Sequence, residues 1–350
     1  MAIEAAVSRA LGGTLPLLPP ARGPITDRLL SRWRGERSDA GQGWEALLDG
    51  VSSAATDDDV QLALHCIYEL SYRGFDGVDD HFETDPFTLR ARRSLETRFE
   101  AELRDAIGDL PADASRYLSA VASASSGPSL SAHVERDGTL AQVREFAVHR
   151  SAYQLKEADP HSWGFPRLAG RAKAAFATIQ HDEYGQGQPG GAHAELFART
   201  LTALGLDATY GHYLPAIPGV TLATGNLISM FGMQRRLLPA LVGHLALFEM
   251  TSVGPMARYS RALARLGVPR EARTFYDVHV VADEEHGRLA LAELVGGFLE
   301  DQPAAGREVA FGAAALSHVE AAFTEHLLSC WARGDSSLRT PLPTARPHAA

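Results

Sequence analysis

A polar stripe along one helical face constrains the fold of this chain more than any other feature. His279, Asp283 and His286 lie at i, i+4 and i+7, so an α-helix places all three on one face. A face with this spacing normally carries apolar residues and packs on the core. Here it carries imidazoles and a carboxylate, which bind iron, manganese or zinc. The alternative is a solvated face, with apolar contacts from neighbours such as Val278 and Val281, and this helix alone leaves both interpretations open.

Two earlier segments offer side chains of the same kinds. Glu183 is expected near the end of one helix, and a glycine-rich turn over 185–191 leads to His193 at the start of the next. Glu157 stands just before an Asp-Pro pair, at the expected end of its own helix. Together the segments supply three carboxylates and three imidazoles, enough for two metal ions with positions left for oxygen or substrate. A carboxylate-rich set suits iron or manganese better than structural zinc.

Composition narrows the class of protein. The chain is 45% hydrophobic and 22% charged, which is ordinary for a soluble globular protein. A net charge of -10 argues against nucleic acid and anionic membranes as partners. The two cysteines, Cys66 and Cys330, argue against a disulfide framework and fit a reduced, cytoplasmic setting. The N-terminus does not resemble a signal peptide, and Pro and Gly interrupt the longest uncharged run, 213–234, so no membrane span is expected.

The chain is expected to be mostly helical, because periodic Ala-, Leu-, Glu- and Arg-rich segments are many and alternating strand patterns are almost absent. The aspartates that follow Thr56 predict an N-cap. Helices are expected at about 25–35, 43–54, 57–73, 86–108, 139–157, 167–184, 193–204, 222–251, 254–265, 269–299 and 308–332. A Ser/Ala/Gly-rich passage at 122–131 is the expected domain boundary.

The predicted domain organisation has three parts. Residues 1–125 form an N-terminal helical extension that serves packing or dimerisation. Residues 126–335 carry the metal-ligand residues, and residues 336–350, rich in Pro, Thr, Arg and Ala, form a disordered tail.

The metal-ligand residues also resemble a known pattern. In order, they are similar to the ligands of the heme-oxygenase-like diiron oxidases, especially of members with three histidines: Glu157, Glu183, His193, His279, Asp283 and His286. The spacings Glu-x9-His and His-x3-Asp-x2-His carry this resemblance. The segments 182–187 and 243–252 look like the subgroup of iron-containing redox enzymes, and the likeness covers about residues 140–300. A ferritin-like site is disfavoured, since the chain contains no Glu-x-x-His pair.

The resemblance implies a fold and an activity. The fold is an all-α, heme-oxygenase-like bundle of about seven core helices, which holds two iron ions cycling between Fe(II) and Fe(III). With O2 as co-substrate and a peroxo-diiron(III) intermediate, such a monooxygenase would N-oxygenate an amine, an amino acid or a guanidine-like substrate in a biosynthetic pathway. The chain shows no flavin or nicotinamide motif, so an external electron donor or reductase is expected as a partner. A homodimer is possible on this interpretation.

Three alternatives stay open. One is an interaction module whose acidic helices form a polar face. The same diiron site could cleave a carbon–carbon bond in, or desaturate, an amino acid or fatty acid. A member of the fold could also bind a small molecule without metal or catalysis.

The resemblance implies one more carboxylate ligand, and the matching position is Glu249. The alternative is that Glu249 pairs with Arg235 or Arg236, arginines that could otherwise hold a substrate carboxylate, as could Lys156. Tyr184 adjoins Glu183 and is either a hydrogen-bond donor near the metal or a packed aromatic residue.

Overall fold

The computed structural model describes residues 15–36, 43–124 and 127–342. Within these ranges the regular structure is entirely helical, with no strand, so the all-α prediction is confirmed. The helices are α2 (Pro24–Trp33), α3 (Trp44–Leu48), α4 (Asp58–Glu69), α5 (Pro86–Ile107), α6 (Ala114–Ser123), α7 (Leu130–Arg136), α8 (Leu140–Gln154), α9 (Asp159–Ser162), α10 (Gly170–Glu183), α11 (His193–Ala203), α12 (Gly219–Met233), α13 (Leu238–Arg265), α14 (Thr274–Leu289), α15 (Gly296–Asp301) and α16 (Gly306–Ala332).

Aspartate side chains cap the helices of the N-terminal part. The Asp57 carboxylate accepts hydrogen bonds from the backbone amides of Asp59 and Val60, as the aspartate cluster predicts. Asp85 caps α5 in the same way, and Pro86 occupies the first helical position. These contacts satisfy amides that have no partner inside the helix and fix where α4 and α5 begin.

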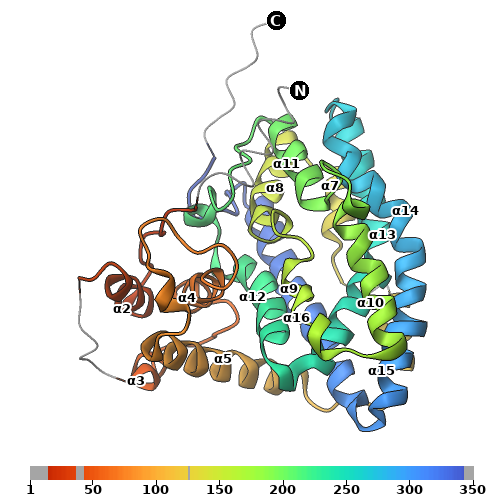
Figure 1. Cartoon of the computed structure of the whole chain (residues 1–350). Coiled ribbons are helices and arrows are strands. Elements are labelled where there is room, and N and C mark those ends of the chain that lie inside the picture. The colour runs from red at the N-terminus through yellow and green to blue at the C-terminus, as the bar shows by residue number, and fades with distance from the viewer. Residues whose placement is uncertain (1–14, 37–42, 125–126, 343–350) are drawn as a thin grey trace, which may run out of the picture.

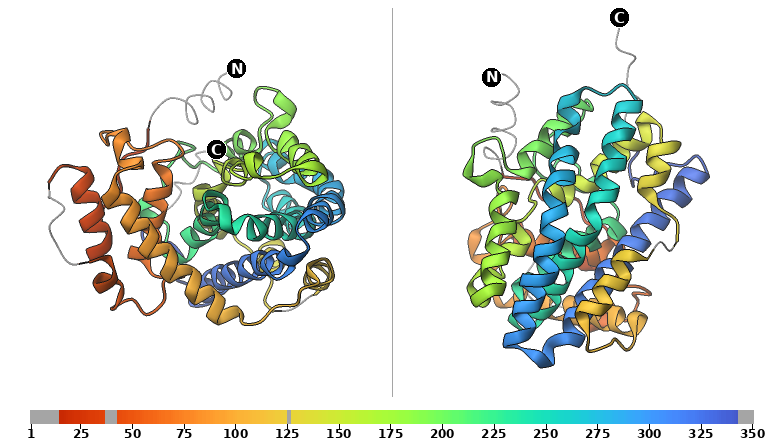
Figure 2. Two further views of the ribbon diagram at one scale, coloured as in Figure 1. Left: turned by 60° about the horizontal axis from the view of Figure 1, so that its bottom comes forward. Right: turned by 90° about the vertical axis from the view of Figure 1, so that its right-hand side faces the viewer.

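Helix α13 lies at the centre of the molecule. It packs against α14 on one side and α16 on another, and α12 packs against α16 as well. Figure 1 shows α2 to α5 gathered on one flank of this bundle, where α4 contacts α12. The right-hand view of Figure 2 shows α13 and α14 running side by side over most of their length. The bundle therefore brings together segments that are far apart in the sequence.

Two glycines allow α13 and α16 to approach closely. A Cβ atom on Gly243 would collide with the carbonyl oxygen of Val309, and one on Gly312 would collide with that of Ala240. Because a larger side chain at either position would push the helices apart, the close packing depends on both glycines.

The boundary between α12 and α13 differs from the prediction. One helix over 222–251 and a second from 254 were expected, but the break lies at residues 234–237 and α13 continues through Pro255. Pro239 fits the first turn of α13, where a missing amide hydrogen costs little. The single backbone hydrogen bond lost at Pro255 is tolerated because α13 is held by its neighbours along its length.

The stretch Arg235–Arg265 is long and apolar enough to cross a membrane by length and composition. In its most apolar window 61% of residues are buried inside the protein. The core helix of a bundle passes the same test, and the packing of α13 between α14 and α16 gives it that position here.

Helices α6 and α7 lie where no helix was expected. Although α6 precedes the predicted domain boundary at residue 125, it packs against α13 and α16, which lie beyond that boundary. The division at residue 125 therefore stays a prediction.

The disordered tail is predicted to start at residue 336, and this start is wrong. Ser337 is buried, and its hydroxyl donates to the Glu145 carboxylate at 2.6 Å. Hydrogen bonds from the backbone and side chains of 336–337 hold this segment against α8. The rest of the predicted tail, residues 343–350, lies outside the described residues.

The predicted helix over 269–299 begins later and contains an irregular turn. Helix α14 starts at Thr274, and residues Ala290–Val295 then form a π-helical segment that leads into α15. Such a turn accommodates an extra residue in a helix and is frequent near functional sites.

Candidate metal centre

The seven residues singled out from the sequence come from five places in the bundle. Glu157 lies in the turn between α8 and α9, Glu183 ends α10 and His193 begins α11. Glu249 lies on α13, and the polar stripe lies on α14 as predicted. All seven side chains are buried: Glu157, Glu183, His193, Glu249, His279, Asp283 and His286. The solvated-face interpretation of α14 is therefore excluded.

Glu157 lies in a strained turn. Helix α8 ends at Gln154, so Glu157 is three residues beyond the helix rather than at its last turn. Ala158, the next residue, has φ of 73°, a left-handed conformation that is unfavourable for a residue with a Cβ atom. Strain of this kind persists only where the surrounding structure holds it, and it clusters at functional sites.

The glycine-rich turn folds back on itself between α10 and α11. Gly185 has φ of 64°, and a Cβ atom there would collide with the backbone of Gly191. This close approach brings the two helix ends together, and His193 Nδ1 lies 2.8 Å from Glu183 Oε2. The turn thus directs both side chains toward one point.

The buried side chains form two clusters that share one residue. The first cluster consists of Glu157, Glu183, His193 and His279, and the second of Glu183, Glu249, Asp283 and His286. In each cluster, one potential ligand atom per residue lies within 4.8 Å of the others. Since Glu183 belongs to both, the clusters are adjacent, and together they would offer ligands to two cations.

Hydrogen bonds outside the clusters orient two of the imidazoles. His279 Nδ1 lies 2.6 Å from the carbonyl oxygen of Phe275 and donates to it, which leaves Nε2 free to face Glu157. His286 Nε2 donates to Asp182 Oδ2 at 2.9 Å, and its Nδ1 lies 3.3 Å from Glu249 Oε2. Partners of this kind fix the tautomer and orientation of metal-binding histidines.

Several polar atoms in the clusters have no hydrogen-bond partner within the described part of the chain. They are Glu157 Oε1 and Oε2, His193 Nδ1, His279 Nε2, Asp283 Oδ1 and His286 Nδ1. His193 Nδ1 is close to Glu183, but the contact lacks hydrogen-bond geometry. Buried polar atoms without partners are costly, and bound cations would satisfy these six atoms at once. The donor set therefore fits iron.

The carboxylates strongly perturb one another. Burial raises the pKa of Glu157 well above its usual value, and the nearby carboxylates of Glu183, Asp283 and Glu249 add to the effect. Burial also raises the pKa of Glu249, to about 8, although His286 offsets part of that rise. Glu183 shows the opposite balance, because His193, His279 and His286 outweigh its burial and lower its pKa to about 2.

His286 carries the compensating charge. Burial opposes protonation, but the carboxylates of Asp283, Glu249 and Asp182 outweigh it and raise the pKa of His286 to about 11. A proton therefore sits among these carboxylates at neutral pH. A metal cation bound to Nδ1 would replace that proton and supply the same electrostatic compensation.

Two residues that support the clusters are not predicted from the sequence. Asp182 binds His286, and the Ser252 hydroxyl donates to Asp283 Oδ2 at 2.5 Å. Asp182 directly precedes Glu183, but no sequence signal separates it from an ordinary solvated carboxylate. Ser252 lies one turn after Glu249, which is a weak signal that both share a face of α13.

Other residues considered from the sequence have different partners. Glu249 lies against His286, whereas Arg236 binds Glu100 in a two-pronged contact. Tyr184 is 38% exposed and donates to Asp159 Oδ1 at 2.8 Å, so it is not a packed core aromatic. Lys156 is buried and pairs with Glu69.

The fold and this centre define a class: an all-helical protein whose bundle encloses two adjoining groups of carboxylates and imidazoles. Residues 144–321, just over half of the chain, match the family model described as iron-containing redox enzyme. The chain therefore belongs to that family, and it is an iron-containing oxidoreductase with a heme-oxygenase-like helical bundle.

A curated relative supports the same assignment. The chain is 27% identical over 146 residues to a nitrosourea synthase from Streptomyces achromogenes subsp. streptozoticus. The alignment covers 42% of this chain and 31% of the relative, so the chain spans about a third of that protein's length.

Proposed function

We propose that this protein is an O2-dependent, non-heme diiron oxidase that N-oxygenates an amine, an amino acid or a guanidine-like substrate. The observation that carries the proposal is the pair of adjoining buried clusters joined by Glu183. Their donor set suits iron. The similarity to a nitrosourea synthase favours N-oxygenation over other reactions on such a site, because a nitrosourea contains a nitrogen–oxygen bond.

Each cluster has a defined part in the proposal. Glu157, His193 and His279 would hold one ion, Asp283, His286 and Glu249 would hold the other, and Glu183 would contact both. Two bound iron ions would supply the electrons and coordination positions needed to activate O2. The chain's own residues orient the ligands and exclude water through burial. Asp182 accepts a hydrogen bond from His286 Nε2, which keeps the proton on that nitrogen.

Electrons and substrate come from outside the site in this proposal. N-oxygenation consumes reducing equivalents, so an external electron donor or reductase serves as a partner, with a small-molecule substrate. We propose a cytoplasmic setting, where thiols such as buried Cys66 and Cys330 remain reduced.

Iron binding provides the first test. Purified protein titrated with Fe(II) in the absence of oxygen should bind close to two ions, and oxygen should then produce a transient visible absorption. His279→Ala and Asp283→Ala should each lower the number of tightly bound ions to about one, because they remove a ligand from different clusters. Glu284→Ala, which changes an exposed carboxylate of α14 outside both clusters, should bind iron like the wild type.

The outcomes separate the proposal from its rivals. Absence of iron binding, or unchanged binding in both ligand variants, would contradict the diiron proposal and favour a metal-free binding protein. Mass spectrometry of products from candidate amines and amino acids distinguishes addition of oxygen to nitrogen from carbon–carbon cleavage. Cleavage or desaturation products alone would contradict N-oxygenation while leaving the diiron centre in place.

A further inference from the structure

We propose that Glu69 in the N-terminal part of the chain is a positioning residue for Glu157, acting through Lys156. This inference rests on the proposed metal role of Glu157 but assigns a new role to a helix outside the centre. Glu69 ends α4, far from the family match that begins at residue 144.

The contact between α4 and the turn is a buried ion pair. Lys156 Nζ lies 2.9 Å from Glu69 Oε2, and the two side chains are only 3% and 1% exposed. The Tyr210 hydroxyl donates to the same oxygen at 2.8 Å. Lys156 Nζ also lies 4.4 Å from the centre of the Tyr72 ring, close enough for a cation–π contact. Lys156 is thus held from several directions by residues that do not belong to α8 or α9.

The ion pair acts on the strained part of the turn. Lys156 directly precedes Glu157, and Ala158 comes next with its left-handed backbone. The amide of Asp159 donates to the carbonyl oxygen of Lys156 at 3.1 Å, which closes the turn. A buried ammonium group without its carboxylate would have to reach solvent or another partner. Loss of the pair, with or without the ammonium group, also releases the strained turn from α4, so the Lys156 backbone and the Glu157 carboxylate would move.

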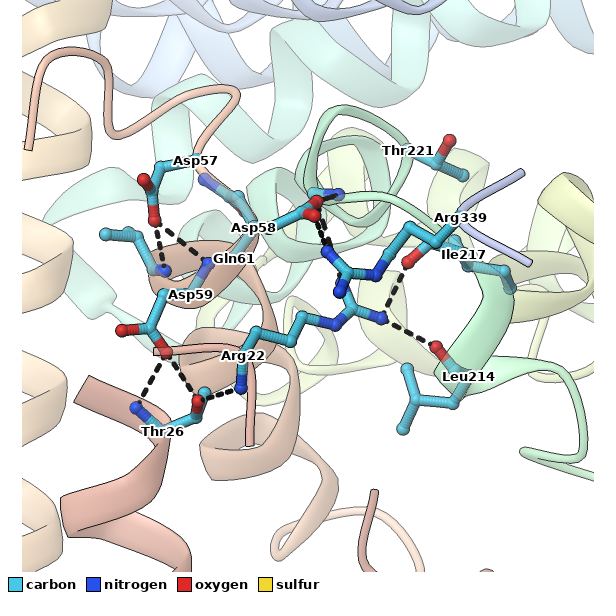
Figure 3. Close-up of polar contacts among 12 residues, drawn as sticks. Arg22, Thr26, Asp57, Asp58, Asp59, Gln61, Leu214, Ile217, Thr221 and Arg339 are labelled. Atoms are coloured by element: carbon cyan, nitrogen blue, oxygen red, sulfur yellow. Dashed lines mark hydrogen bonds and ion pairs between the residues drawn. The ribbon is translucent and has the colours of Figure 1, made fainter. Parts of the chain in front are cut away.

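Helix α4 is anchored firmly enough to serve as a support. At its other end, Asp58 accepts a hydrogen bond from the Gly219 amide at 2.5 Å and forms an ion pair with Arg339. Figure 3 shows the ion pair of Asp58 with Arg339 beside Arg22, whose guanidinium donates to the carbonyl oxygens of Leu214 and Ile217 at 2.8 and 2.7 Å. Contacts at both ends of α4 therefore fix Glu69 relative to the bundle.

The two clusters should respond differently to loss of this support. Glu157 belongs to the first cluster only, and the second contains no residue of the turn. Removing the Glu69–Lys156 pair should therefore weaken one iron site while sparing the other. A general loss of folding stability would affect both.

The test is a calorimetric titration with Fe(II) in the absence of oxygen. Lys156→Met, and the double variant Glu69→Gln/Lys156→Met, remove the pair without leaving an unpaired lysine. One iron-binding step should be lost in His279→Ala. In each pair-removing variant the affinity of that step should fall by ~10-fold or more, the range seen when residues supporting metal ligands are changed. The step lost in Asp283→Ala should keep its wild-type affinity.

Tyr68→Phe is the matched control. Tyr68 lies beside Glu69 on α4, is equally buried, and donates to Glu96 Oε1 at 2.9 Å rather than to the turn. Its removal should leave both binding steps unchanged. Tyr210→Phe keeps both charges and loses one hydrogen bond to Glu69. It should weaken the same iron-binding step as the double variant, by a smaller factor. If the charge variants do not fold, this variant provides the test.

The results distinguish this inference from the proposed function. If the wild type binds no iron, the proposed function fails. If the wild type binds two ions and the folded double variant binds both with wild-type affinity, only the positioning role of Glu69 is overturned. Where the charge variants do not fold, wild-type affinity for both ions in Tyr210→Phe overturns that role. Equal weakening of both steps would overturn it as well.

Discussion

His286 illustrates how single side chains define this centre. One of its ring nitrogens donates to Asp182, and the other faces the carboxylates of Glu249 and Asp283. The imidazole is therefore fixed from outside the second cluster before any cation binds. A histidine in the same sequence position without such a partner could rotate, and it would lose orientation as a ligand.

We expect Asp182→Ala to weaken the proposed iron site that contains His286 by ~10- to 100-fold, because the ring loses the acceptor that orients it. The measurement is the affinity for Fe(II) in the absence of oxygen. Asp182→Asn retains an oxygen that can accept from Nε2 and should have a smaller effect. Lys173→Ala, at an exposed position of the same helix, is the control, and wild-type affinity in Asp182→Ala would refute the orienting role.

Glu145 links the C-terminal segment to α8 and makes stability depend on pH. Burial alone would raise its pKa, but hydrogen bonds from Ser336, Ser337 and Trp331 outweigh burial and lower it. A carboxylate whose pKa is lower in the folded state stabilises the fold above its unfolded pKa, about 4.3. That stabilisation is lost as the pH falls toward the folded pKa.

We therefore expect Glu145→Gln to lower the thermal midpoint at pH 7, with a difference from wild type that is constant above about pH 5 and shrinks in more acidic buffer. Thermal unfolding monitored by circular dichroism between pH 3 and 8 measures this. Glu325→Gln, at an exposed position of α16, should match the wild-type profile. A Glu145→Gln difference that does not change with pH would show that the carboxylate charge is not involved.

At the scale of elements, the close packing of α13 on α16 depends on glycine. Gly243→Ala places a methyl group against the Val309 carbonyl oxygen, and we expect a loss of about 1–3 kcal/mol in the free energy of unfolding. Gly254→Ala is the matched control on the same helix, since nothing lies within 4 Å of its Cβ position. That variant should be neutral or more stable by up to about 1 kcal/mol. Denaturant unfolding compares the two, and equal stability would contradict close packing at Gly243.

The predictability of the elements depends on the strength of local signals. The aspartate cap of α4, the start of α11 at His193 and the polar face of α14 are all evident from local patterns. Pro255 misleads the prediction, because a proline inside a helix is a strong local signal for a break but tertiary contacts on α13 override it. Helices α6 and α7 lie in a stretch whose Ser, Ala and Gly content resembles a linker.

At the scale of the whole molecule, residue types are predictable and their partners are not. The spacing on α14 and the order of Glu157, Glu183 and His193 suggest one centre, and the structure brings these residues together. Nothing in the sequence pairs Glu69 with Lys156 or Arg104 with Glu308, because such contacts depend on how distant helices pack. Periodicity indicates which face of a helix is buried, but it carries no information about the residue opposite.

The π-helical segment after α14 has a consequence for how this chain can vary. Each residue advances an α-helix by about 100°, so one extra residue changes the angular phase between the two helical segments that it joins. On the N-terminal side the polar stripe of α14 faces the centre, and on the C-terminal side Gly297 and Phe298 are buried, with Gly297 against Arg171 of α10. An uninterrupted α-helix would turn one of these faces away. Homologues should therefore tolerate substitutions within Ala290–Val295 more readily than a change in its length.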